Sequence, residues 1–461
     1  MENMGYFIIS KDEAIKLLEN RSLTIAVIGQ GKMGLPIDVV FLEAGYRVIG
    51  VDVNPETVQK INEGNPPIIG EPGVIEGIRK GLKEKKFECT LSLEKAVDES
   101  DVIIIIIPTL IDKYRNPELQ PVIKLINSIG AYMKPGKLIV IESTVPPLTT
   151  EQIVKKQLEQ ISSLKAGKDF GLGFAPERTY SGRAIEDIRD NYPKIVGGVD
   201  PRSTERIALL YETIAKKGVI QMSSSTAAEA VKIFKGIYRD VNIALANEFA
   251  KISEKIGVNV HEVIKAANSE PFSHIHRPGA GVGGHCIPVY PQFLINIADQ
   301  FGISAALTKK GREINLSMPY HVVNRTIIAL NKVNKNLKGS KITLLGLAYR
   351  GNVKEYRYSP TFDVIKGLKE YEAKIVLHDP LYKEEELREI IDIKFEEDLK
   401  KAIHNSDCIV ILTDHSHYKE LDISFFDEQA NNPYAIIDTR HIFGHINERE
   451  NDKRVIVGIG E

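Results

Sequence analysis

Short apolar stretches alternate with helix-length segments over the first half of the chain. The first stretch, LTIAVIG from residue 23, leads through the glycine-rich QGKMG into LPIDVVFLEAG, and a second stretch, YRVIGVD, follows. Further apolar runs lie at residues 101–107 and 137–141, and KIVGG at residues 194–198 closes the series. Apolar runs of this length, separated by helical segments, are typical of parallel strands that are covered on both faces. We expect a doubly wound parallel sheet over roughly the first 220 residues.

A long helix is predicted in the middle of the chain. From residue 226 to residue 256 the apolar residues recur at helical spacing, without a proline or a pair of glycines. Gly236 is the single weak point of this helix, because glycine is a poor helix former. A helix of this length can join two domains and carry an interface with a second copy of the chain.

A second alternating series begins at residue 341. It runs through KITLLGLAY, a helix after Pro360, KIVLHD, a further helix, DCIVILTD and AIIDTR, which predicts another parallel-sheet domain. A chain of 461 residues is also too long for one ordinary core. The predicted fold class is therefore α/β, with two Rossmann-like doubly wound parallel-sheet domains joined by a helical middle domain with a long central helix. The expected domains are residues 1–222, 223–330 and 331–461.

Composition narrows the choice of partners and compartment. The 60 basic and 62 acidic residues are interspersed without a basic stripe, so nucleic acid is not an expected partner. Cys89, Cys286 and Cys408 are odd in number and far apart, which favours a reducing compartment over a disulfide framework, and metal-ligand spacing is absent. The longest strongly apolar run, residues 102–107, is far too short for a membrane span. We predict a cytoplasmic protein that binds neither a metal nor a membrane.

A dinucleotide-binding motif follows the first predicted strand. Gly29, Gly31 and Gly34 form a G-x-G-x-x-G pattern that opens the next helix, and Asp52 ends the second strand. The glycines allow a tight turn and close approach of a pyrophosphate to the helix N-terminus, while Asp52 can accept hydrogen bonds from ribose hydroxyls. Because a carboxylate repels a 2′-phosphate, NAD is favoured over NADP as the cofactor. The alternative is a glycine turn that only packs the helix on the strand.

The stretch PGAGVGGHCIP, residues 278–288, places Cys286 directly after a run of glycines. Glycines leave backbone N–H groups free to approach a ligand, and the oriented amides of such a loop can lower the pKa of a thiol. A thiolate beside a bound nicotinamide could then attack an aldehyde. The alternative is an inert, packed thiol.

Several further motifs are similar to those of one enzyme family. They are ESTVPP at residues 142–147, PER at 176–178, RDVNIALANE at 239–248, GGHCIP at 283–288, LLGLAYRGNVKEYRYSP at 344–360 and DTR at 438–440. With these motifs the chain resembles, over nearly its whole length, the UDP-glucose/GDP-mannose dehydrogenase family, and most of all its UDP-N-acetylhexosamine branch. The resemblance implies a four-electron oxidation in polysaccharide biosynthesis, in which two NAD are reduced and the C6 alcohol of a UDP-sugar, UDP-N-acetyl-D-mannosamine in particular, becomes a carboxylate.

The same resemblance implies roles for individual residues. Cys286 captures the intermediate aldehyde as a thiohemiacetal, whose second hydride loss leaves a thioester. Lys232 stabilises the developing oxyanion, and Glu177 holds or activates water. The residues implied in cofactor binding, besides the motif glycines and Asp52, are Thr109, Ser143, Thr144 and Arg357. The residues implied in binding the nucleotide sugar are Arg178, Thr179, Arg239, Gly281, Gly283, Tyr349, Arg350 and Arg440.

The chain departs from the family pattern at three places around this expected site. The family has an asparagine four residues after its helix lysine, whereas Gly236 follows Lys232 here. Tyr290 stands where an aspartate usually follows the cysteine, and residues 270–274 read EPFSH, without the arginine of the branch. Either the site is rebuilt for a related UDP-hexose, or the protein is a weakly catalytic paralogue that binds nucleotide sugars.

A third alternative is a related dehydrogenase that stops after one hydride transfer and does not use Cys286. Among the nearby side chains, His285 and His274 are candidates for proton transfer. The long central helix and the resemblance together imply a homodimer or a higher homo-oligomer.

Overall fold

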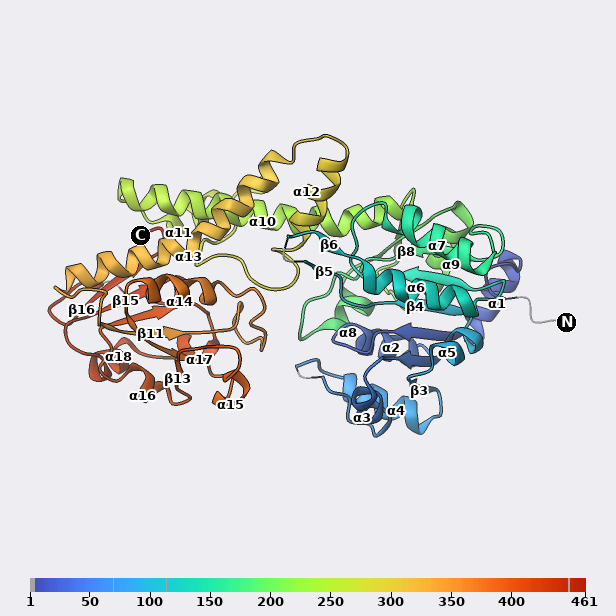
Figure 1. The fold of residues 1–461 in the computed structure, drawn as a ribbon, viewed down its shortest axis with the longest axis horizontal. Helices are drawn as coiled ribbons and strands as arrows, with labels where there is room; N and C mark the ends of the chain where they lie inside the picture. The colour runs from blue at the N-terminus through green and yellow to red at the C-terminus, as the bar shows by residue number, and fades with distance from the viewer. Residues whose placement is uncertain (1–4, 69, 113, 447) are drawn as a thin grey trace. The chain divides into compact units, whose positions relative to one another are not determined.

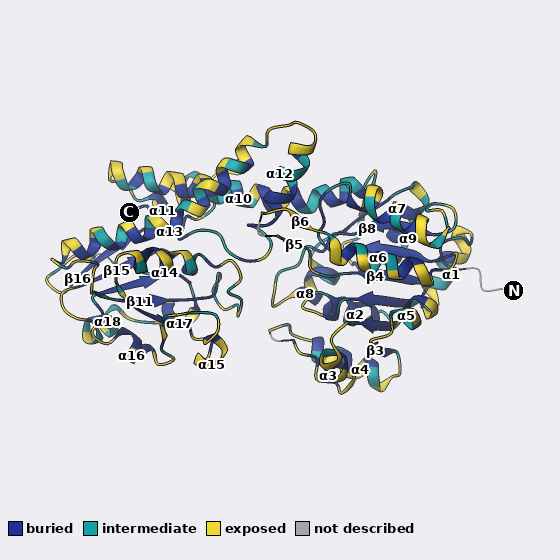
Figure 2. Ribbon diagram, viewed as in Figure 1, coloured by how far each residue is buried: buried dark blue, intermediate teal, exposed yellow. Residues whose placement is uncertain are grey.

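The structure, a computed structural model, describes residues 5–68, 70–112, 114–446 and 448–461 (Figure 1). The chain forms two compact units. Unit 1 comprises Met1–Lys235 and Gln292–Phe301, and unit 2 comprises Gly236–Pro291 and Gly302–Glu461. Each unit is built around one large sheet. Most strand residues of these two sheets are buried, while many exposed residues lie on the outer sides of the helices (Figure 2).

Unit 1 contains an eight-stranded sheet with the order β10-β9-β8-β7-β4-β1-β2-β3. Neighbouring strands are parallel, as predicted, except β8 and β9, which are antiparallel. Between these two strands the chain forms the short helix α8 (Ala184–Glu186) and the π-helix η2 (Asp187–Asn191), without the longer α-helix that usually connects parallel neighbours. The strands are β1 (Thr24–Ile28), β2 (Arg47–Val51), β3 (Phe87–Thr90), β4 (Val102–Ile105), β7 (Leu138–Ile141), β8 (Gly171–Phe174), β9 (Lys194–Gly198) and β10 (Val219–Gln221).

Helices cover both faces of this sheet, so its central strands have no polar face. In β1, Ile25 and Val27 belong to one buried apolar cluster, and Ala26 and Ile28 belong to another. This division explains why the strand reads as an unbroken apolar run. The remaining elements are α1 (Lys11–Glu19), α2 (Gly34–Glu43), α3 (Pro55–Asn62), α4 (Val74–Lys83), α5 (Leu93–Glu99), β5 (Leu110–Ile111), β6 (Pro117–Glu118), α6 (Gln120–Tyr132), the π-helix η1 (Thr149–Val154), α7 (Lys155–Ser162), α8 (Ala184–Glu186), the π-helix η2 (Asp187–Asn191) and α9 (Pro201–Glu212).

The predicted long helix is confirmed as α10 (Ser225–Ile256), which has 32 residues. Gly236 is buried and does not interrupt it, and the boundary between the two units falls at this residue. The following helices are α11 (Val260–Ala267), α12 (Tyr290–Gln300) and α13 (Ala306–Lys332). Within the described residues, no helix has both the length and the apolar character that crossing a membrane would require.

Unit 2 contains the second predicted sheet, whose six strands are all parallel in the order β13-β12-β11-β14-β15-β16. The strands are β11 (Lys341–Leu345), β12 (Lys374–His378), β13 (Lys394–Phe395), β14 (Cys408–Ile411), β15 (Tyr434–Asp438) and β16 (Arg454–Gly458). The helices of this part are α14 (Pro360–Glu370), α15 (Glu384–Leu387), α16 (Leu399–Ile403), α17 (Ser416–Lys419) and α18 (Ile423–Gln429).

Both sheets reverse their strand order beside one strand. In unit 1 the strand β1 lies between β2 and β4, and in unit 2 the strand β11 lies between β12 and β14. Ligands of doubly wound sheets bind outside the carboxyl ends of the strands at such switch points. The dinucleotide motif follows β1, and the segment that carries Tyr349 and Arg350 follows β11, so each unit has predicted site residues at its switch point.

Candidate active site

The conformation and packing of the turn after β1 explain why glycine is needed there. Gly29 has φ +107°, and a Cβ there would lie 2.4 Å from the carbonyl oxygen of Ile106. A Cβ on Gly34 would lie 1.8 Å from the carbonyl oxygen of Gly29. Around Gly31, by contrast, a Cβ would meet no described atom within 4 Å. Gly29 and Gly34 are therefore required by the fold, whereas Gly31 leaves open space in front of the helix, where a pyrophosphate can approach.

Asp52 is fixed at the end of β2. Its Oδ2 accepts a hydrogen bond of 3.0 Å from the backbone N–H of Gln30, and its Oδ1 accepts one of 2.9 Å from Asn54. These bonds hold the carboxylate beside the glycine turn, where it can still accept hydrogen bonds from ribose hydroxyls through its remaining lone pairs. The position fits the adenosine ribose of a dinucleotide.

Three further predicted cofactor residues lie after β4 and β7. The hydroxyl oxygen of Thr109 is buried and forms no hydrogen bond with any described residue. A hydroxyl in this condition fits a ligand that forms hydrogen bonds. Ser143 is buried, and its Oγ accepts a hydrogen bond of 2.8 Å from the backbone N–H of Ile107, so it shapes the segment that leads to Thr109. Thr144, next to it, is half-buried.

Glu177 belongs to a buried cluster that the sequence did not reveal. Lys194 Nζ donates hydrogen bonds to Glu142 Oε1 at 3.0 Å and to Glu177 Oε2 at 3.1 Å. The hydroxyl of Tyr211 donates to the same Glu142 oxygen, and the Lys194 ammonium lies 4.8 Å from the centre of the Tyr211 ring. Two carboxylates thus share one cation in a site that water hardly reaches.

The charged groups of this cluster shift one another's pKa values. Burial raises the pKa of Glu142, although Lys194 opposes the change. Burial alone would lower the pKa of Lys194, but the two carboxylates outweigh it, and the pKa stands above its ordinary value. Lys194 therefore stays protonated and holds the carboxylate of Glu177 in one orientation.

Other predicted residues of unit 1 gather around Glu177. The ammonium of Lys232 on α10 donates a hydrogen bond to the backbone oxygen of Glu177. Thr179 Oγ1 lies 3.5 Å from the sulfur of Met33 in the dinucleotide turn, which joins this segment to the cofactor motif. The guanidinium of Arg178 is half-buried and donates to the backbone oxygen of Pro193, and burial lowers its pKa. The predicted general-base segment and the predicted cofactor site are therefore neighbours within unit 1.

In unit 2 the loop of residues 278–288 that contains Cys286, the cysteine loop, is tightly packed at its glycines. A Cβ on Gly283 would lie 2.6 Å from Tyr349 Cβ, and one on Gly284, which has φ +87°, would lie 2.9 Å from the Tyr349 ring. The N–H of Gly284 donates to the backbone oxygen of Arg357 at 2.8 Å. Gly281, with φ +133°, also adopts a conformation that favours glycine. The loop is thereby held against the segment that follows β11.

Cys286 differs from the other two cysteines. Cys89 and Cys408 are buried, and burial raises the pKa of each thiol, whereas Cys286 is half-buried. A hydrogen bond with Cys286 raises the pKa of the neighbouring His285 above its ordinary value, against the effect of burial. A histidine beside a thiol can form an ion pair with the thiolate, which is the nucleophilic form.

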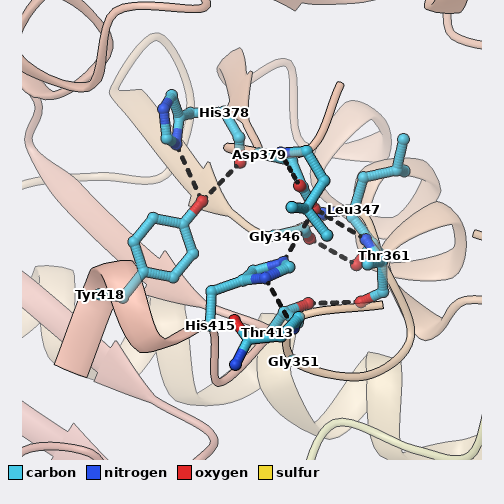
Figure 3. A network of polar contacts seen from close by, with 12 residues as sticks. Gly346, Leu347, Gly351, Thr361, His378, Asp379, Thr413, His415 and Tyr418 are labelled. Carbon is cyan, nitrogen blue, oxygen red and sulfur yellow. Dashed lines mark hydrogen bonds and ion pairs between the residues drawn. The ribbon is translucent and has the colours of Figure 1, made fainter. Parts of the chain in front are cut away.

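The segment after β11 is anchored by a buried polar network (Figure 3). Asp379 Oδ2 accepts hydrogen bonds from the backbone N–H groups of Leu347 at 2.7 Å and Ala348 at 2.9 Å, and from His415 Nε2 at 3.2 Å. The other ring nitrogen of His415 accepts a hydrogen bond of 3.0 Å from the N–H of Asn352, so the proton of the neutral ring lies on Nε2. The network fixes residues 347–352 at both ends, and Tyr349 and Arg350 lie between them.

The predicted arginines of unit 2 differ in their surroundings. Arg350 and Arg357 are exposed, and Arg239 on α10 is half-buried. Arg440 donates to Asp414 at 2.9 Å and lies next to the cysteine loop, where a Cβ on Gly279 would stand 3.5 Å from its guanidinium. Exposed and half-buried guanidinium groups suit the binding of a diphosphate.

Thus each unit assembles one part of the predicted site. Unit 1 holds the dinucleotide turn, Asp52, Thr109, Ser143, Thr144, residues 177–179 and Lys232, and unit 2 holds Arg239, the cysteine loop, Tyr349, Arg350, Arg357 and Arg440. Sequence reasoning missed Lys194, Glu142, Asp379 and His415. A lysine at the first position of the otherwise apolar strand β9 is the local signal that could have drawn attention to Lys194.

Comparison with known proteins places this geometry among sugar-nucleotide enzymes. Models of the UDP-glucose/GDP-mannose dehydrogenase family match three parts of the chain: the NAD binding domain at residues 23–215, the central domain at 226–317 and the UDP binding domain at 343–445. The UDP-N-acetyl-D-mannosamine dehydrogenase of Methanococcus vannielii is 37% identical over 429 residues, which cover 91% of this chain and 93% of the relative. That of Pyrococcus horikoshii is 35% identical over 421 residues, with coverages of 91% and 96%.

Solved structures agree with these relatives. The UDP-D-ManNAc dehydrogenase of Pyrococcus horikoshii superposes with a TM-score of 0.86 at 34% identity, covering 95% of this chain and 99% of that chain. The NDP-N-acetyl-D-galactosaminuronic acid dehydrogenase of Methanosarcina mazei Go1 gives a TM-score of 0.84 at 33% identity, with 98% of both chains covered. The prediction of two Rossmann-like domains joined by a helical middle is confirmed, and so is NAD as the cofactor.

Proposed function

Because the chain belongs to the UDP-glucose/GDP-mannose dehydrogenase family and is an NAD-dependent UDP-sugar dehydrogenase, we propose that it oxidises the C6 alcohol of UDP-N-acetyl-D-mannosamine to the carboxylate. The observation that carries the proposal is the half-buried Cys286, which lies in a loop packed against Tyr349 and next to His285, whose pKa the thiol raises. A thiol placed in this way supports an oxidation that continues past the aldehyde.

The proposed chemistry passes through a covalent bond to Cys286. NAD held at the turn after β1 would supply the hydride acceptor for both oxidations. After the first, the thiolate attacks the aldehyde carbon, and the oxygen of the resulting thiohemiacetal takes a proton. After the second, a thioester remains, which water cleaves to the carboxylic acid and the free thiol. The thioester makes the second oxidation possible without free aldehyde leaving the protein.

Two side chains of unit 1 have proposed roles at the reacting carbon. The ammonium of Lys232 stabilises the negative charge on the oxygen of the tetrahedral species. The Glu177 carboxylate, which Lys194 holds in place at 3.1 Å, orients the water that cleaves the thioester. Arg178, Thr179, Arg239, Gly281, Gly283, Tyr349, Arg350 and Arg440 bind the nucleotide sugar in this proposal, and Arg357 contacts the cofactor.

The proposal includes a homodimer. On α10, the exposed apolar residues Tyr238, Leu245, Phe249, Ile252 and Ile256 recur at helical spacing and form one stripe. Exposed apolar stripes of this kind mark protein interfaces, and a second copy of the same helix supplies a matching surface. Sedimentation at several protein concentrations tests this part. The free cysteines support a reducing, cytoplasmic compartment.

The function is tested with a panel of nucleotide sugars: UDP-N-acetyl-D-mannosamine, UDP-N-acetyl-D-glucosamine, UDP-N-acetyl-D-galactosamine, UDP-glucose and GDP-mannose. We expect the highest kcat/KM for the first, with the uronic acid as the product in a mass spectrum. A higher kcat/KM for another UDP-sugar would replace the proposed substrate. Binding of the panel without any formation of NADH would instead identify the weakly catalytic paralogue.

A further inference from the structure

The cysteine loop begins at a pair of buried asparagines. Asn247, on α10, is 0% exposed, and Asn315, on α13, is 1% exposed. The backbone N–H of Gly279, the second residue of the loop, donates a hydrogen bond of 2.9 Å to Asn247 Oδ1. Asn247 Nδ2 in turn donates to Asn315 Oδ1 at 2.9 Å. The start of the loop is thus joined to two helices of unit 2 through two side-chain amides.

The other end of this network is Asp240, one residue after Arg239 on α10. Asn315 Nδ2 donates to the backbone oxygen of Asp240 and to its Oδ1, each at 2.9 Å. Arg312 Nη1 donates to the same Oδ1 at 2.6 Å. Asp240 is 0% exposed and Arg312 is 5% exposed, so the carboxylate and the guanidinium compensate each other in a site that water hardly reaches.

The direction of the hydrogen bonds in this network is fixed at both ends. A backbone N–H can only donate, so Gly279 requires the oxygen of Asn247 on its side. A backbone carbonyl can only accept, so Asp240 requires the nitrogen of Asn315 on its side. The two groups that remain, Asn247 Nδ2 and Asn315 Oδ1, are then a matched donor and acceptor. Turning either amide over would bring two donors together at one end and two acceptors together at the other.

The loop stays close to the network beyond Gly279. A Cβ on Gly281 would lie 3.2 Å from the backbone oxygen of Asn315. Further along, Gly283 and Gly284 are held against Tyr349, as described above. Gly281, one of the residues proposed to bind the nucleotide sugar, therefore lies between two anchored points. Without the bond from Gly279, only the second of these anchors would remain.

We propose that Asn247 and Asn315 are positioning residues, which hold the start of the cysteine loop through Gly279 in the conformation that binds the nucleotide sugar. They act on the ligand through the backbone of the loop. The role of the loop in this inference rests on the proposed function. The test therefore uses measurements that need no turnover, with UDP as the probe for binding.

Two substitutions of Asn247 separate the anchoring of the loop from stability. Asn247→Leu removes the acceptor for Gly279 and the donor for Asn315, whereas Asn247→Asp keeps the acceptor and loses only the donor. Both should lower the melting temperature, because each leaves a buried polar group unsatisfied. Hydrogen–deuterium exchange at residues 279–284, followed by mass spectrometry, should become about tenfold faster in Asn247→Leu and stay within about twofold of the wild type in Asn247→Asp.

Binding of UDP should follow the loop and not the melting temperature. We expect its Kd to rise about tenfold in Asn247→Leu and to change by less than about threefold in Asn247→Asp. The Kd for NADH, which relies on unit 1, should be unchanged in both. Thr326→Val is the matched control, since the buried hydroxyl of Thr326, also on α13, donates only to Val322 of its own helix at 2.9 Å. This variant should leave both the exchange of the loop and the Kd for UDP unchanged.

Exchange and UDP affinity that change equally in Asn247→Leu and Asn247→Asp, or that do not change in Asn247→Leu, would overturn the positioning role. The wild type provides a further test without any variant: the amide of Gly279 should exchange as slowly as those in the middle of α10, and fast exchange there would overturn the anchor. If these results are as expected and no UDP-sugar is oxidised, the proposed function fails and the positioning role stands.

Discussion

The aromatic ring of Tyr290 fills the space beside Gly236, so that a Cβ on Gly236 would lie only 2.4 Å from Tyr290 Cδ2. Both residues are buried, and the backbone N–H of Tyr290 donates to the carbonyl oxygen of Cys286 at 3.0 Å. Two of the three positions at which the chain departs from the family pattern are therefore in direct contact. The ring of Tyr290 occupies the space that a side chain at position 236 would need.

This coupling predicts the behaviour of the two reversions. Gly236→Asn alone should lower the free energy of unfolding by about 1–3 kcal/mol, because the new side chain overlaps the tyrosine ring. Combined with Tyr290→Asp, the same change should cost much less, since the ring is no longer there. Denaturant unfolding of both single variants and the double variant measures the coupling. Additive effects of the two changes would show that the residues do not restrict each other.

The buried cluster around Glu177 predicts a large effect for the lysine that its two carboxylates share. Lys194→Met removes the ammonium that donates to both Glu142 and Glu177, and should lower the free energy of unfolding by about 3–5 kcal/mol. The matched control is Lys216→Met, since Lys216 pairs with Asp190 at 2.8 Å on an exposed surface, where such pairs contribute about 0–1 kcal/mol. Urea unfolding compares the two variants. Similar small losses in both would contradict the arrangement of the cluster.

The glycine turn predicts two different outcomes for the same substitution. Gly34→Ala forces a methyl group onto the backbone oxygen of Gly29 and should lower stability by about 3 kcal/mol. Gly31→Ala meets open space, so the melting temperature should stay near that of the wild type. It should nevertheless raise the Kd for NAD about tenfold, because the methyl group projects where the pyrophosphate approaches. Unchanged NAD affinity in a well-folded Gly31→Ala variant would place the cofactor elsewhere.

Much of the fold could be predicted because it depends on local pattern. The apolar run at β1, the glycine turn and Asp52 belong to a βαβ unit whose parts are adjacent in sequence. The helix α10 could be predicted because its apolar residues recur at helical spacing along its whole length. The antiparallel pairing of β8 and β9 was not predicted. Both are short apolar runs, and such a run does not indicate whether a strand lies parallel or antiparallel to its neighbour. It depends on the connection between them, which is irregular.

The polar networks could not be predicted, because they join residues that are far apart in the sequence. Lys194 donates a hydrogen bond to Glu142, which lies 52 residues earlier, and Asp379 accepts one from His415, which lies 36 residues later. A single sequence gives the residue types and leaves open which of them share a buried space. The same applies to Gly236 and Tyr290, since each departure was visible alone and only the folded chain shows their contact.

A buried glutamate on α10 predicts a pH dependence of stability. Glu229 accepts hydrogen bonds from the N–H groups of Leu148 and Thr150, each at 2.8 Å, and from the Thr150 hydroxyl at 2.6 Å. Burial nevertheless raises its pKa from 4.5 to about 7. The folded protein thus binds this proton more tightly than the unfolded chain does, so the stabilisation is complete below about pH 4.5 and is lost as the pH rises to about 7.

The expected change in the free energy of unfolding from this group is about 3 kcal/mol over that range. Glu229→Gln, which cannot titrate, should remove this part of the slope, whereas Glu151→Gln on the exposed side of η1 should retain it. Urea unfolding of the three proteins at a series of pH values measures the slopes. An identical slope in the wild type and in Glu229→Gln would assign the pH dependence to other groups.

The most direct test of the account is the amount of NADH formed for each UDP-N-acetyl-D-mannosamine consumed, with NAD in excess. The account predicts two NADH per sugar and a uronic acid as the product for the wild type, and loss of the acid in Cys286→Ala, whose binding of NADH and UDP should be intact. One NADH per sugar with a released aldehyde, or full formation of the acid by Cys286→Ala, would contradict the role of Cys286 and with it the proposed four-electron oxidation.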